Sequence, residues 1–598
     1  MIRDKGCGEI RESDVGRNLN LCGWVFRRRD HGGLIFVDLR DRSGIIQVVF
    51  NPDVSANAHE IAHELRSEYV ISVKGQIRKR PDGTENPHML TGTVEMYADK
   101  LEVLNKAAPL PISIEDVGDT SETLRLKYRY LDLRRPEMQR NLIIRHKAAK
   151  VIRDYLNEKG FLEIETPVLT KSTPEGARDY LVPSRLNPGY FYALPQSPQI
   201  FKQILMISGF EKYFQIVRCF RDEDLRADRQ PEFTQVDLEM SFTDREDVIE
   251  VIESMMKRLF KDVLDVEVDI PFKRLSFHES MERFGNDSPD LRFGLELKDM
   301  ADLSEKSSFK VFIDALNSGG RVKAINGKGM ASLSRKEIDL LTEEVISLGA
   351  KGLSWIKVKN GFESPVAKFF KEEIMREMSL RLEAEEGDLL LFVADEEKVV
   401  HNVLGRMRIE LGKRLNLIRP VYKFVWVTDF PLFEWNDEEG RFEAMHHPFT
   451  APADEGVEKL FSVSKVNIKP NTPEFRLLSN VKAKAYDIVL NGYEIGGGSI
   501  RIHRQDLQRK MFEILGISEE ESKIKFGFLL DAFEYGAPPH GGIALGLDRL
   551  VMIMVGASTI RDVIAFPKTQ KASCLMSGTP SPVDLKQLKE LSIKPELP

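Results

Sequence analysis

Three separated segments of this chain place arginines and acids inside apolar strand or helix patterns. They are FRDEDLRADRQPEFTQVDLE (220–239), YDIVLNGYEIGGGSIRIH (486–503) and GIALGLDRL (542–550). A charge buried in apolar surroundings is costly unless it is paired or faces a ligand. One such segment would favour a structural ion pair. Three of them favour a site for a polyanion together with metal ions.

The residue types in these segments suit a nucleoside triphosphate. Arginines such as Arg221 and Arg549 can neutralise phosphates and stabilise the charge that develops during group transfer. Carboxylates such as Asp487 and Glu494 can hold Mg²⁺ through oxygen ligands. The sequence has no GxxxxGK(S/T) loop, and the glycines at 496–498 open a strand rather than follow one. We therefore expect a nucleotide site that is neither a P-loop nor a dinucleotide fold.

The first segment is predicted to be a turn followed by a strand. Alternate residues of that strand place four side chains on one face: Phe233, Gln235, Asp237 and Glu239. A strand normally buries an apolar face and offers the other face to water. The acids on this face therefore either meet solvent at a sheet edge or are aimed at a charged ligand.

Composition and charge limit the classes of protein that this chain can belong to. The 598 residues carry a net charge of −8, which argues against indiscriminate nucleic-acid binding. Two short basic runs, at 27–29 and 78–80, permit a local basic surface, although such runs more often form a solvated face.

The start of the chain and its cysteines bear on its compartment. MIRDKGCGEI has no apolar signal region, and no apolar run is long enough to cross a bilayer. The four cysteines are scattered without a CxxC pair: Cys7, Cys22, Cys219 and Cys574. This pattern fits reduced thiols better than disulfides or a zinc site. We expect a cytoplasmic protein with no membrane partner.

The first 105 residues are rich in short β segments. Five of them, at 21–29, 33–41, 44–50, 69–80 and 93–104, are separated by turn residues, and a short helix is expected at 57–66. Five strands with a helix in that place match an OB-fold barrel. Strand count alone leaves any other small β-barrel open.

The rest of the chain changes character several times. Residues 106–140 look like a hinge, and a helix is predicted over about 140–159, followed by a strand. Residues 288–422 mix helices and strands without chemistry that we can identify, so we interpret them as an inserted α/β domain. Apolar strands return at 423–565, and 566–598 forms a C-terminal extension.

The motifs of this chain resemble those of class II aminoacyl-tRNA synthetases, and specifically of bacterial-type aspartyl-tRNA synthetases. GFLEIETPVLT resembles motif 1, a dimer-interface helix and strand that ends at Pro167. The segment at 214–239 resembles motif 2, and GIALGLDRLVMIM resembles motif 3. The resemblance covers nearly the whole chain. It implies an α+β multidomain homodimer, in which an antiparallel-sheet catalytic domain flanked by helices is built from residues 141–287 and 423–565.

By this resemblance, Arg221 grips the α-phosphate of ATP and the substrate carboxylate, and Arg549 clamps the far end of a bent ATP. These two arginines are the expected catalytic residues, and Asp487 and Glu494 would bind Mg²⁺. The full set expected to bind ATP is Arg221, Asp222, Glu223, Gln230, Glu494, Gly546, Leu547, Asp548 and Arg549.

The segment LPQSPQIFKQ (194–203) bears on the amino acid. It places Gln199 and Lys202 on one helical face, and a lysine suits a substrate with an acidic side chain. A lysyl enzyme would need an acid there, and an asparaginyl enzyme has no negative side chain to match. The resemblance implies that Lys202 and Arg501 meet the aspartate side chain. It also implies an aspartate pocket formed by Glu175, Ser197, Gln199, Lys202, Arg221, Asp237, His446, His447 and Arg501, with His446 favoured over His447.

The OB-fold domain of such an enzyme would read the anticodon. The residues expected to do so are Arg29, Phe36, Gln47 and Glu95. His31 and Gly83 resemble the residues of enzymes that charge both tRNA-Asp and tRNA-Asn, whereas strictly selective relatives carry a bulkier apolar residue and a lysine. The relaxed form implies an amidotransferase that acts on Asp-tRNA-Asn.

Other readings stay open on the sequence alone. The enzyme could be strictly specific for tRNA-Asp, or it could be an asparaginyl or lysyl ligase, against which Lys202 argues. A non-catalytic OB-fold nucleic-acid-binding protein with a synthetase-like domain would have gaps in the ATP set, and Arg221, Glu494 and Arg549 are all in place.

Overall fold

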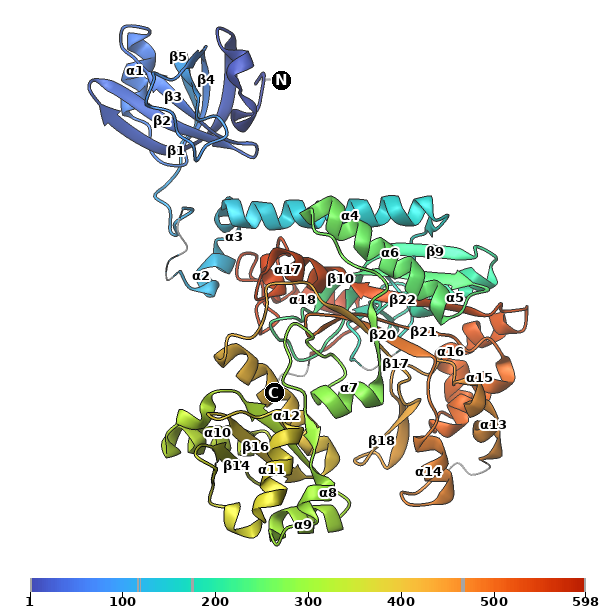
Figure 1. Ribbon diagram of the computed structural model, residues 1–598. Helices are drawn as coiled ribbons and strands as arrows, with labels where there is room; N and C mark the ends of the chain where they lie inside the picture. The colour runs from blue at the N-terminus through green and yellow to red at the C-terminus, as the bar shows by residue number, and fades with distance from the viewer. Residues whose placement is uncertain (1–2, 116–117, 119, 174–176, 464–467, 596–598) are drawn as a thin grey trace. The chain divides into compact units, whose positions relative to one another are not determined.

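The protein is described by a computed structural model over residues 3–115, 118, 120–173, 177–463 and 468–595 (Figure 1). The chain divides into two compact units. The first comprises Met1–Arg140 with Leu575–Ser577, and the second comprises Asn141–Cys574 with Gly578–Pro598. Each unit is described by itself.

The first unit contains a closed five-stranded barrel in the order β1-β2-β3-β5-β4. The strands are β1 (Asn18–His31), β2 (Leu34–Asp41), β3 (Gly44–Phe50), β4 (Val70–Lys79) and β5 (Val94–Asn105), and α1 (Ala56–His63) connects β3 to β4. Alternate residues of β1 such as Leu21 and Val25 are fully buried inside the barrel. This topology confirms the expected OB-fold. Two short helices, α2 (Glu122–Lys127) and α3 (Arg129–Asp132), follow the barrel.

The second unit is built on an eight-stranded sheet in the order β11-β17-β20-β21-β22-β10-β9-β6. Its strands are β6 (Leu162–Glu163), β9 (Lys212–Phe220), β10 (Glu232–Ser241), β11 (Lys273–Ser276), β17 (Phe424–Thr428), β20 (Ala485–Leu490), β21 (Tyr493–Ile500) and β22 (His540–Gly546). The six central strands are antiparallel, as expected. The edge strands β6 and β11 pair in parallel, so the sheet is mixed. Each edge strand reaches its neighbour through a long connection, which parallel pairing requires.

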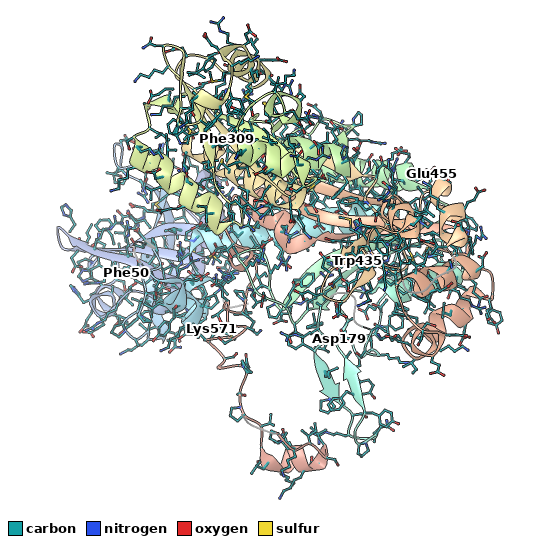
Figure 2. The ribbon with its side chains drawn as sticks, turned by 90° about the horizontal axis from the view of Figure 1, so that it is seen from below. Phe50, Asp179, Phe309, Trp435, Glu455 and Lys571 are labelled. Carbon is teal, nitrogen blue, oxygen red and sulfur yellow. The ribbon has the colours of Figure 1, made fainter. Side chains whose placement is uncertain are left out.

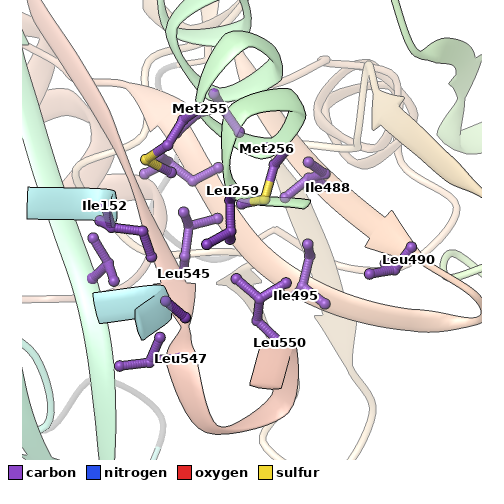
Figure 3. Packing of buried hydrophobic residues seen from close by; sticks show 14 of the residues in the cluster. Ile152, Met255, Met256, Leu259, Ile488, Leu490, Ile495, Leu545, Leu547 and Leu550 are labelled. Atoms are coloured by element: carbon purple, nitrogen blue, oxygen red, sulfur yellow. The ribbon is translucent and has the colours of Figure 1, made fainter. Parts of the chain in front are cut away.

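Three helices cover this sheet: α4 (Pro136–Glu158), α6 (Arg245–Leu264) and α17 (Leu547–Val555). Figure 3 shows Met255, Met256 and Leu259 of α6 pointing toward apolar side chains of the sheet. Each fully buried side chain of this kind contributes about 1.5–3 kcal/mol. The helix predicted over about 140–159 is confirmed as α4, and its Ile152 is fully buried in the same core.

A second sheet lies between β11 and β17 in the sequence, in the order β12-β13-β16-β14-β15. Its strands are β12 (Lys298–Asp299), β13 (Arg321–Gly327), β14 (Ser354–Val358), β15 (Phe362–Glu363) and β16 (Leu389–Asp395). Its helices are α8 (Ala301–Ser304), α9 (Lys310–Asn317), α10 (Arg335–Ser347), α11 (Glu372–Arg381) and α12 (Glu397–Arg414). All of β16 is buried, because its alternate residues join two separate apolar clusters. We call residues 298–414 the five-stranded subdomain.

The remaining elements surround the large sheet. They are β7 (Leu181–Pro183), β8 (Phe191–Ala193), α5 (Gln199–Ile207), α7 (Phe277–Phe284), β18 (Phe433–Asn436), β19 (Arg441–Ala444), α13 (Asp454–Ser462), α14 (Pro473–Ser479), α15 (Gln505–Ile514), α16 (Glu519–Phe533) and α18 (Leu585–Glu590). The β7–β8 hairpin projects from the body near Asp179 (Figure 2), and Arg185 in its loop pairs with Glu590 of α18 at 2.7 Å. No helix within the described ranges is long and apolar enough to span a membrane.

Candidate active site

A cavity of about 190 Å³ opens where the three charged segments meet on the large sheet. β10, β21 and the N-terminus of α17 form its walls, because β22 pairs with both β10 and β21 in the sheet centre. Seven of the nine residues expected to bind ATP line the cavity: Arg221, Glu223, Gln230, Glu494, Gly546, Asp548 and Arg549.

Arg221 and Arg549 each have a buried donor without a partner in the part of the chain that the structure describes. The guanidinium of Arg221 lies 5.1 Å from the centre of the Phe233 ring, and its buried Nε has no partner among the described residues. Nη2 of Arg549 contacts Asp228 at 3.0 Å and Nη1 donates to the carbonyl oxygen of Glu494, but its Nε has no partner there either. Buried donors are normally satisfied, so these two are available to an anionic ligand.

The other residues expected at the ATP site have different environments. Asp222 does not line the cavity and pairs with Arg178 at 3.4 Å in an exposed position. The side chain of Leu547 belongs to the core. Asp548 accepts from the backbone N–H of Thr234 at 2.7 Å and pairs with Arg145, so its oxygens fasten α17 to β10.

Gln230 is held by the C-terminal segment. Its Nε2 donates to the carbonyl oxygen of Lys568 at 3.0 Å, and its Oε1 accepts from the N–H of the same residue at 2.7 Å. Glu223 accepts from Arg229 at 3.3 Å. The loop between β9 and β10 is therefore held in place by Lys568, which lies far along the chain.

Asp487 and Glu494, the expected Mg²⁺ ligands, lie on adjacent strands with Gly497 beside them. A Cβ added to Gly497 would lie 2.8 Å from Oδ1 of Asp487 and 3.5 Å from Oε1 of Glu494, so a glycine keeps this space open. Burial and the Asp487 carboxylate raise the pKa of Glu494 to about 7. Two carboxylates in such a space fit Mg²⁺, which usually takes one or two protein carboxylates and completes its shell with water and phosphates. Over the described ranges, no group of three or more acids, histidines or cysteines is gathered for a metal.

A buried network of opposite charges continues along β10 from the cavity. Nζ of Lys202, on α5, lies 3.1 Å from Asp237 and 3.3 Å from Glu239. Nε of Arg501 donates to Glu239 at 2.9 Å. All four side chains are at most 2% exposed. Asp237 and Glu239 therefore meet buried cations and not solvent, so this strand face is not a solvated sheet edge.

Spare donors and acceptors in this network are unevenly distributed. All five N–H groups of Arg501 have partners, which are Glu239, Ser499, His447 and the carbonyl oxygen of Gly542. Lys202 has three donors and contacts two carboxylates, so one donor is to spare. Oδ2 of Asp237 and Nε2 of Gln199 are buried with no hydrogen-bond partner among the described residues. A polar ligand could satisfy these atoms.

The two consecutive histidines belong to different parts of the site. Nε2 of His447 lies 2.6 Å from Arg501, and burial together with that cation holds the pKa of His447 well below its usual value. Nε2 of His446 lies 3.4 Å from Asp487, at the carboxylate pair. The structure thus places His447, and not the favoured His446, on the arginine expected to bind aspartate. Ser197 accepts from the N–H of Gln199 at 3.3 Å, and Glu175 lies outside the described residues.

Eight residues that line the cavity were not among those expected to bind ATP, and they include Phe233, Gln235 and Asp228. The first two share their strand face with Asp237 and Glu239, so the alternation that singled out the acids also contained them. Asp228 had no such signal, because its role depends on Arg549, which is 321 residues away in the chain.

The residues expected to read an anticodon gather on one face of the barrel. Nη2 of Arg29 contacts Asp38 at 2.8 Å and Gln47 at 3.3 Å, and Gln47 donates to Glu95 at 2.7 Å. Phe36 pairs with Arg29 in the strand register and is half-buried, on the outer side of β2. The side chains form a connected polar surface with an aromatic ring beside it.

The two residues expected to affect tRNA choice are exposed, His31 at the end of β1 and Gly83 in the loop between β4 and β5. Gly83 has φ of 83°, a conformation that residues with a Cβ rarely adopt. A lysine at this position would therefore strain the loop backbone, although its Cβ would meet no other atom within 4 Å among the described residues.

Comparisons with known proteins agree with this arrangement. Residues 121–570 match the family described as tRNA synthetases class II (D, K and N), and residues 19–104 match the OB-fold nucleic acid binding domain. A protein of Thermodesulfovibrio yellowstonii called aspartate–tRNA(Asp/Asn) ligase is 61% identical over 99% of this chain and 100% of its own length. A protein of Aquifex aeolicus with the same name is 56% identical over 99% of this chain and 98% of its own length.

Solved structures share the fold. Asparaginyl-tRNA synthetase from Pyrococcus horikoshii, complexed with asparaginyl-adenylate, has a TM-score of 0.59 at 20% identity and covers 95% of this chain and 99% of its own. Aspartyl tRNA synthetase from Entamoeba histolytica has a TM-score of 0.56 at 17% identity, with 94% and 91% covered. At these identities the likeness concerns the fold alone.

Proposed function

The chain belongs to the class II tRNA synthetases of the D, K and N group and, within it, to the aspartate–tRNA(Asp/Asn) ligases, and we propose that it joins L-aspartate to both tRNA-Asp and tRNA-Asn with ATP. It is an enzyme, an aminoacyl-tRNA ligase. The observation that carries the choice of amino acid is Lys202, a buried cation with a donor to spare beside the nucleotide cavity.

An acidic side chain fits this pocket better than its amide. Aspartate would bring a carboxylate to Lys202 and Arg501, whereas asparagine would leave these buried cations without a new counter-charge. Sites built around such groups reject the uncharged analogue strongly. The α-ammonium of the substrate would meet Oδ2 of Asp237, which has no hydrogen-bond partner among the described residues. Because every donor of Arg501 is occupied, the incoming carboxylate would displace His447 from it.

The first step would form aspartyl-adenylate. An oxygen of the α-carboxylate attacks the α-phosphorus of ATP, the bond from that phosphorus to the bridging oxygen breaks, and pyrophosphate leaves. Two anions must approach each other, so Arg221 and Arg549 would act by neutralising charge and fixing the phosphates in line. Mg²⁺ held by Asp487 and Glu494 would supply further positive charge to the phosphates.

The second step would transfer the aspartyl group to tRNA. The terminal ribose hydroxyl of the tRNA attacks the activated carbonyl carbon, AMP leaves, and the hydroxyl proton is released. The barrel would hold the anticodon through the surface of Arg29, Gln47 and Glu95, with a base stacked on Phe36. We place the choice between the two tRNAs at His31 and Gly83. Aspartate placed on tRNA-Asn would then require an amidotransferase to convert it to asparagine.

We also propose a homodimer in the cytoplasm. Leu162, Val168, Leu169 and Phe210 are between 44% and 52% exposed in and around the segment that resembles motif 1. A second copy of the chain would cover them. Light scattering behind a sizing column would test the dimer.

The predicted division into 1–105, 106–140, 141–287, 288–422, 423–565 and 566–598 is supported by the two separate sheets of the second unit.

The deciding experiment is aspartate charging of two purified transcripts, tRNA-Asp and tRNA-Asn, with ATP and Mg²⁺. Charging of both is the expected result. Charging of tRNA-Asp alone would contradict the role of His31 and Gly83 and leave the aspartate ligase in place. Folded protein that charges neither, and that shows no aspartate-dependent pyrophosphate exchange, would overturn the proposal.

A further inference from the structure

The turn between β20 and β21 connects the two expected Mg²⁺ ligands. Asp487 lies four residues before Asn491, and Glu494 lies two residues after Gly492. Asn491 has φ of 54° and Gly492 has φ of 85°, which is typical of a tight hairpin of the Asn-Gly kind. Since a hairpin's register is set by its turn, any shift of this turn would move both carboxylates.

Both chain segments that connect the five-stranded subdomain to the large sheet contact this turn. On the returning side, Oδ1 of Asn491 accepts from the N–H of Lys423 at 2.8 Å, and Nδ2 donates to the carbonyl oxygen of Val421 at 2.9 Å. On the outgoing side, a Cβ added to Gly492 would lie 3.1 Å from Cβ of Asp290. The turn is therefore packed between the outgoing segment and the returning segment.

Arg408 of α12 fixes the outgoing segment. Its side chain is fully buried and donates to four carbonyl oxygens, those of Asp290 at 2.8 Å, Phe293 at 2.9 Å, Gly294 at 2.9 Å and Leu295 at 3.1 Å. Its guanidinium also lies 4.1 Å from the centre of the Phe293 ring and 4.9 Å from that of Phe284. A lysine could not reproduce this planar fork of donors between two rings.

The contact between α12 and the outgoing segment is also close in the backbone. A Cβ on Gly285 would lie 2.4 Å from the carbonyl oxygen of His401, and one on Gly412 would lie 2.7 Å from the Phe293 ring. No Cβ fits at either place, so α12 and this segment approach as closely as glycines allow. The subdomain thus has a rigid connection to Asp290 and, through it, to the turn.

We propose that the five-stranded subdomain positions the Mg²⁺-binding hairpin, and that Arg408 and Asn491 are the positioning residues that transmit this. The inference rests on the proposed function, because it assigns Asp487 and Glu494 to the nucleotide's metal ion. Neither positioning residue touches a reacting atom. From positions outside the site, they fix the distance between the carboxylates of Asp487 and Glu494.

Two variants test this from opposite sides of the turn. Arg408→Lys keeps the charge and removes the fork, and Asn491→Gly removes the side-chain hydrogen bonds and keeps a residue that tolerates positive φ. Leu341→Ala is the matched control, since Leu341 is buried in the core of the same subdomain. It should lower the melting temperature without altering the turn.

The first measurement is hydrogen exchange of the peptide spanning 486–500, read by mass spectrometry on the full-length protein. We expect faster exchange in both test variants and no change in Leu341→Ala. The second is Mn²⁺ binding in the presence of ATP, followed by electron paramagnetic resonance. Loss of outer-shell support typically costs about 10–100-fold in metal affinity, so we expect a weakening of that order in both variants.

The third measurement is aspartate-dependent pyrophosphate exchange against free Mg²⁺. We expect the Mg²⁺ requirement to rise while KM for aspartate stays within about twofold, because the side-chain hydrogen bonds of Asn491 and Arg408 go to the two connecting segments and to no described residue of the expected aspartate pocket. Unchanged exchange of 486–500 and unchanged Mn²⁺ binding in both variants would overturn the inference. A wild-type protein without pyrophosphate exchange would instead contradict the proposed function, and the hydrogen-exchange result would remain informative.

Discussion

The aspartate side and the phosphate side of the candidate site use the same residue types in opposite ways. On the aspartate side, Lys202 and Arg501 lie against Asp237 and Glu239 with at most 2% exposure, so each charge has an opposite charge in contact. On the phosphate side, charged groups line an open cavity of about 190 Å³. There, Nε of Arg221 and of Arg549 have no partner among the described residues.

Under the proposed function, this difference separates the residues that select aspartate from those that act on ATP. Paired buried charges form a rigid surface, which a ligand must match in shape and charge. Unpaired donors around an open cavity gain their partners when the ligand arrives, and they act most strongly where charge develops. The contrast also predicts that the two sides will respond differently to substitution, since removing a paired buried charge on the first side should cost more unfolding free energy than removing Arg549 on the second.

Lys202→Met should have the largest effect. It leaves Asp237 and Glu239 with one buried cation between them, and removing one partner of a buried charge pair costs about 3–5 kcal/mol of unfolding free energy. It also removes the cation expected to select aspartate, so pyrophosphate exchange should fall by about 10⁴-fold. Urea unfolding and exchange assays measure the two effects. Lys257→Met, at an exposed position of α6, is the control and should change neither.

Arg549→Ala should separate activity from stability. The residue makes a half-exposed ion pair with Asp228, and such pairs contribute less than about 1 kcal/mol. Loss of a donor that stabilises developing charge costs about 10²–10³-fold in kcat. Steady-state kinetics of pyrophosphate exchange measure the loss of activity, and urea unfolding measures the loss of stability. A loss of stability as large as that of Lys202→Met would remove the distinction between the two sides.

Glu494 gives the phosphate side a pH dependence. Its pKa is raised to about 7, so lowering the pH through that value protonates an expected Mg²⁺ ligand and should increase the Mg²⁺ needed for half-maximal exchange. Without ligand, the free energy of unfolding should instead increase as the pH falls. A raised folded-state pKa means that the folded protein holds this proton more tightly, so its contribution to stability is present at low pH and is lost as pH rises through about 7.

Glu494→Gln is the test of this assignment. The variant should bind Mg²⁺ more weakly at every pH, and the part of the pH dependence that is centred near 7 should disappear from both the Mg²⁺ titration and the melting curve. A pH dependence that persists unchanged in Glu494→Gln would assign it to another group, such as His446 beside Asp487.

The smallest effect should come from the barrel. His31→Leu combined with Gly83→Lys should reduce charging of tRNA-Asn by about tenfold, since one altered contact is typically worth about 1–3 kcal/mol of discrimination. Charging of tRNA-Asp should change less. Pyrophosphate exchange without tRNA should not change, because both positions belong to the other compact unit. Equal loss with both tRNAs would indicate a damaged loop rather than altered selection.

The sequence predicted elements and local faces well, and it predicted contacts across the chain poorly. The barrel was predicted from five short strands and the helix between the third and fourth, and the shared face of Phe233, Gln235, Asp237 and Glu239 on β10 was predicted from simple alternation. The sequence could not indicate that Asp548 would be occupied by Thr234 and Arg145, because those contacts depend on three-dimensional packing. His446 and His447 are neighbours, and only the conformation of their loop determines which one meets Arg501.

The pairing of Gln230 with Lys568 joins residues that are 338 positions apart. A chain emerges from the ribosome with its N-terminus first, so the barrel can fold long before all the residues that form the candidate ATP cavity have been made. A nascent chain that stops before Lys568 would carry a complete barrel and an incomplete cavity. If the barrel holds the anticodon as proposed, such a product would occupy tRNA without charging it and would compete with complete enzyme.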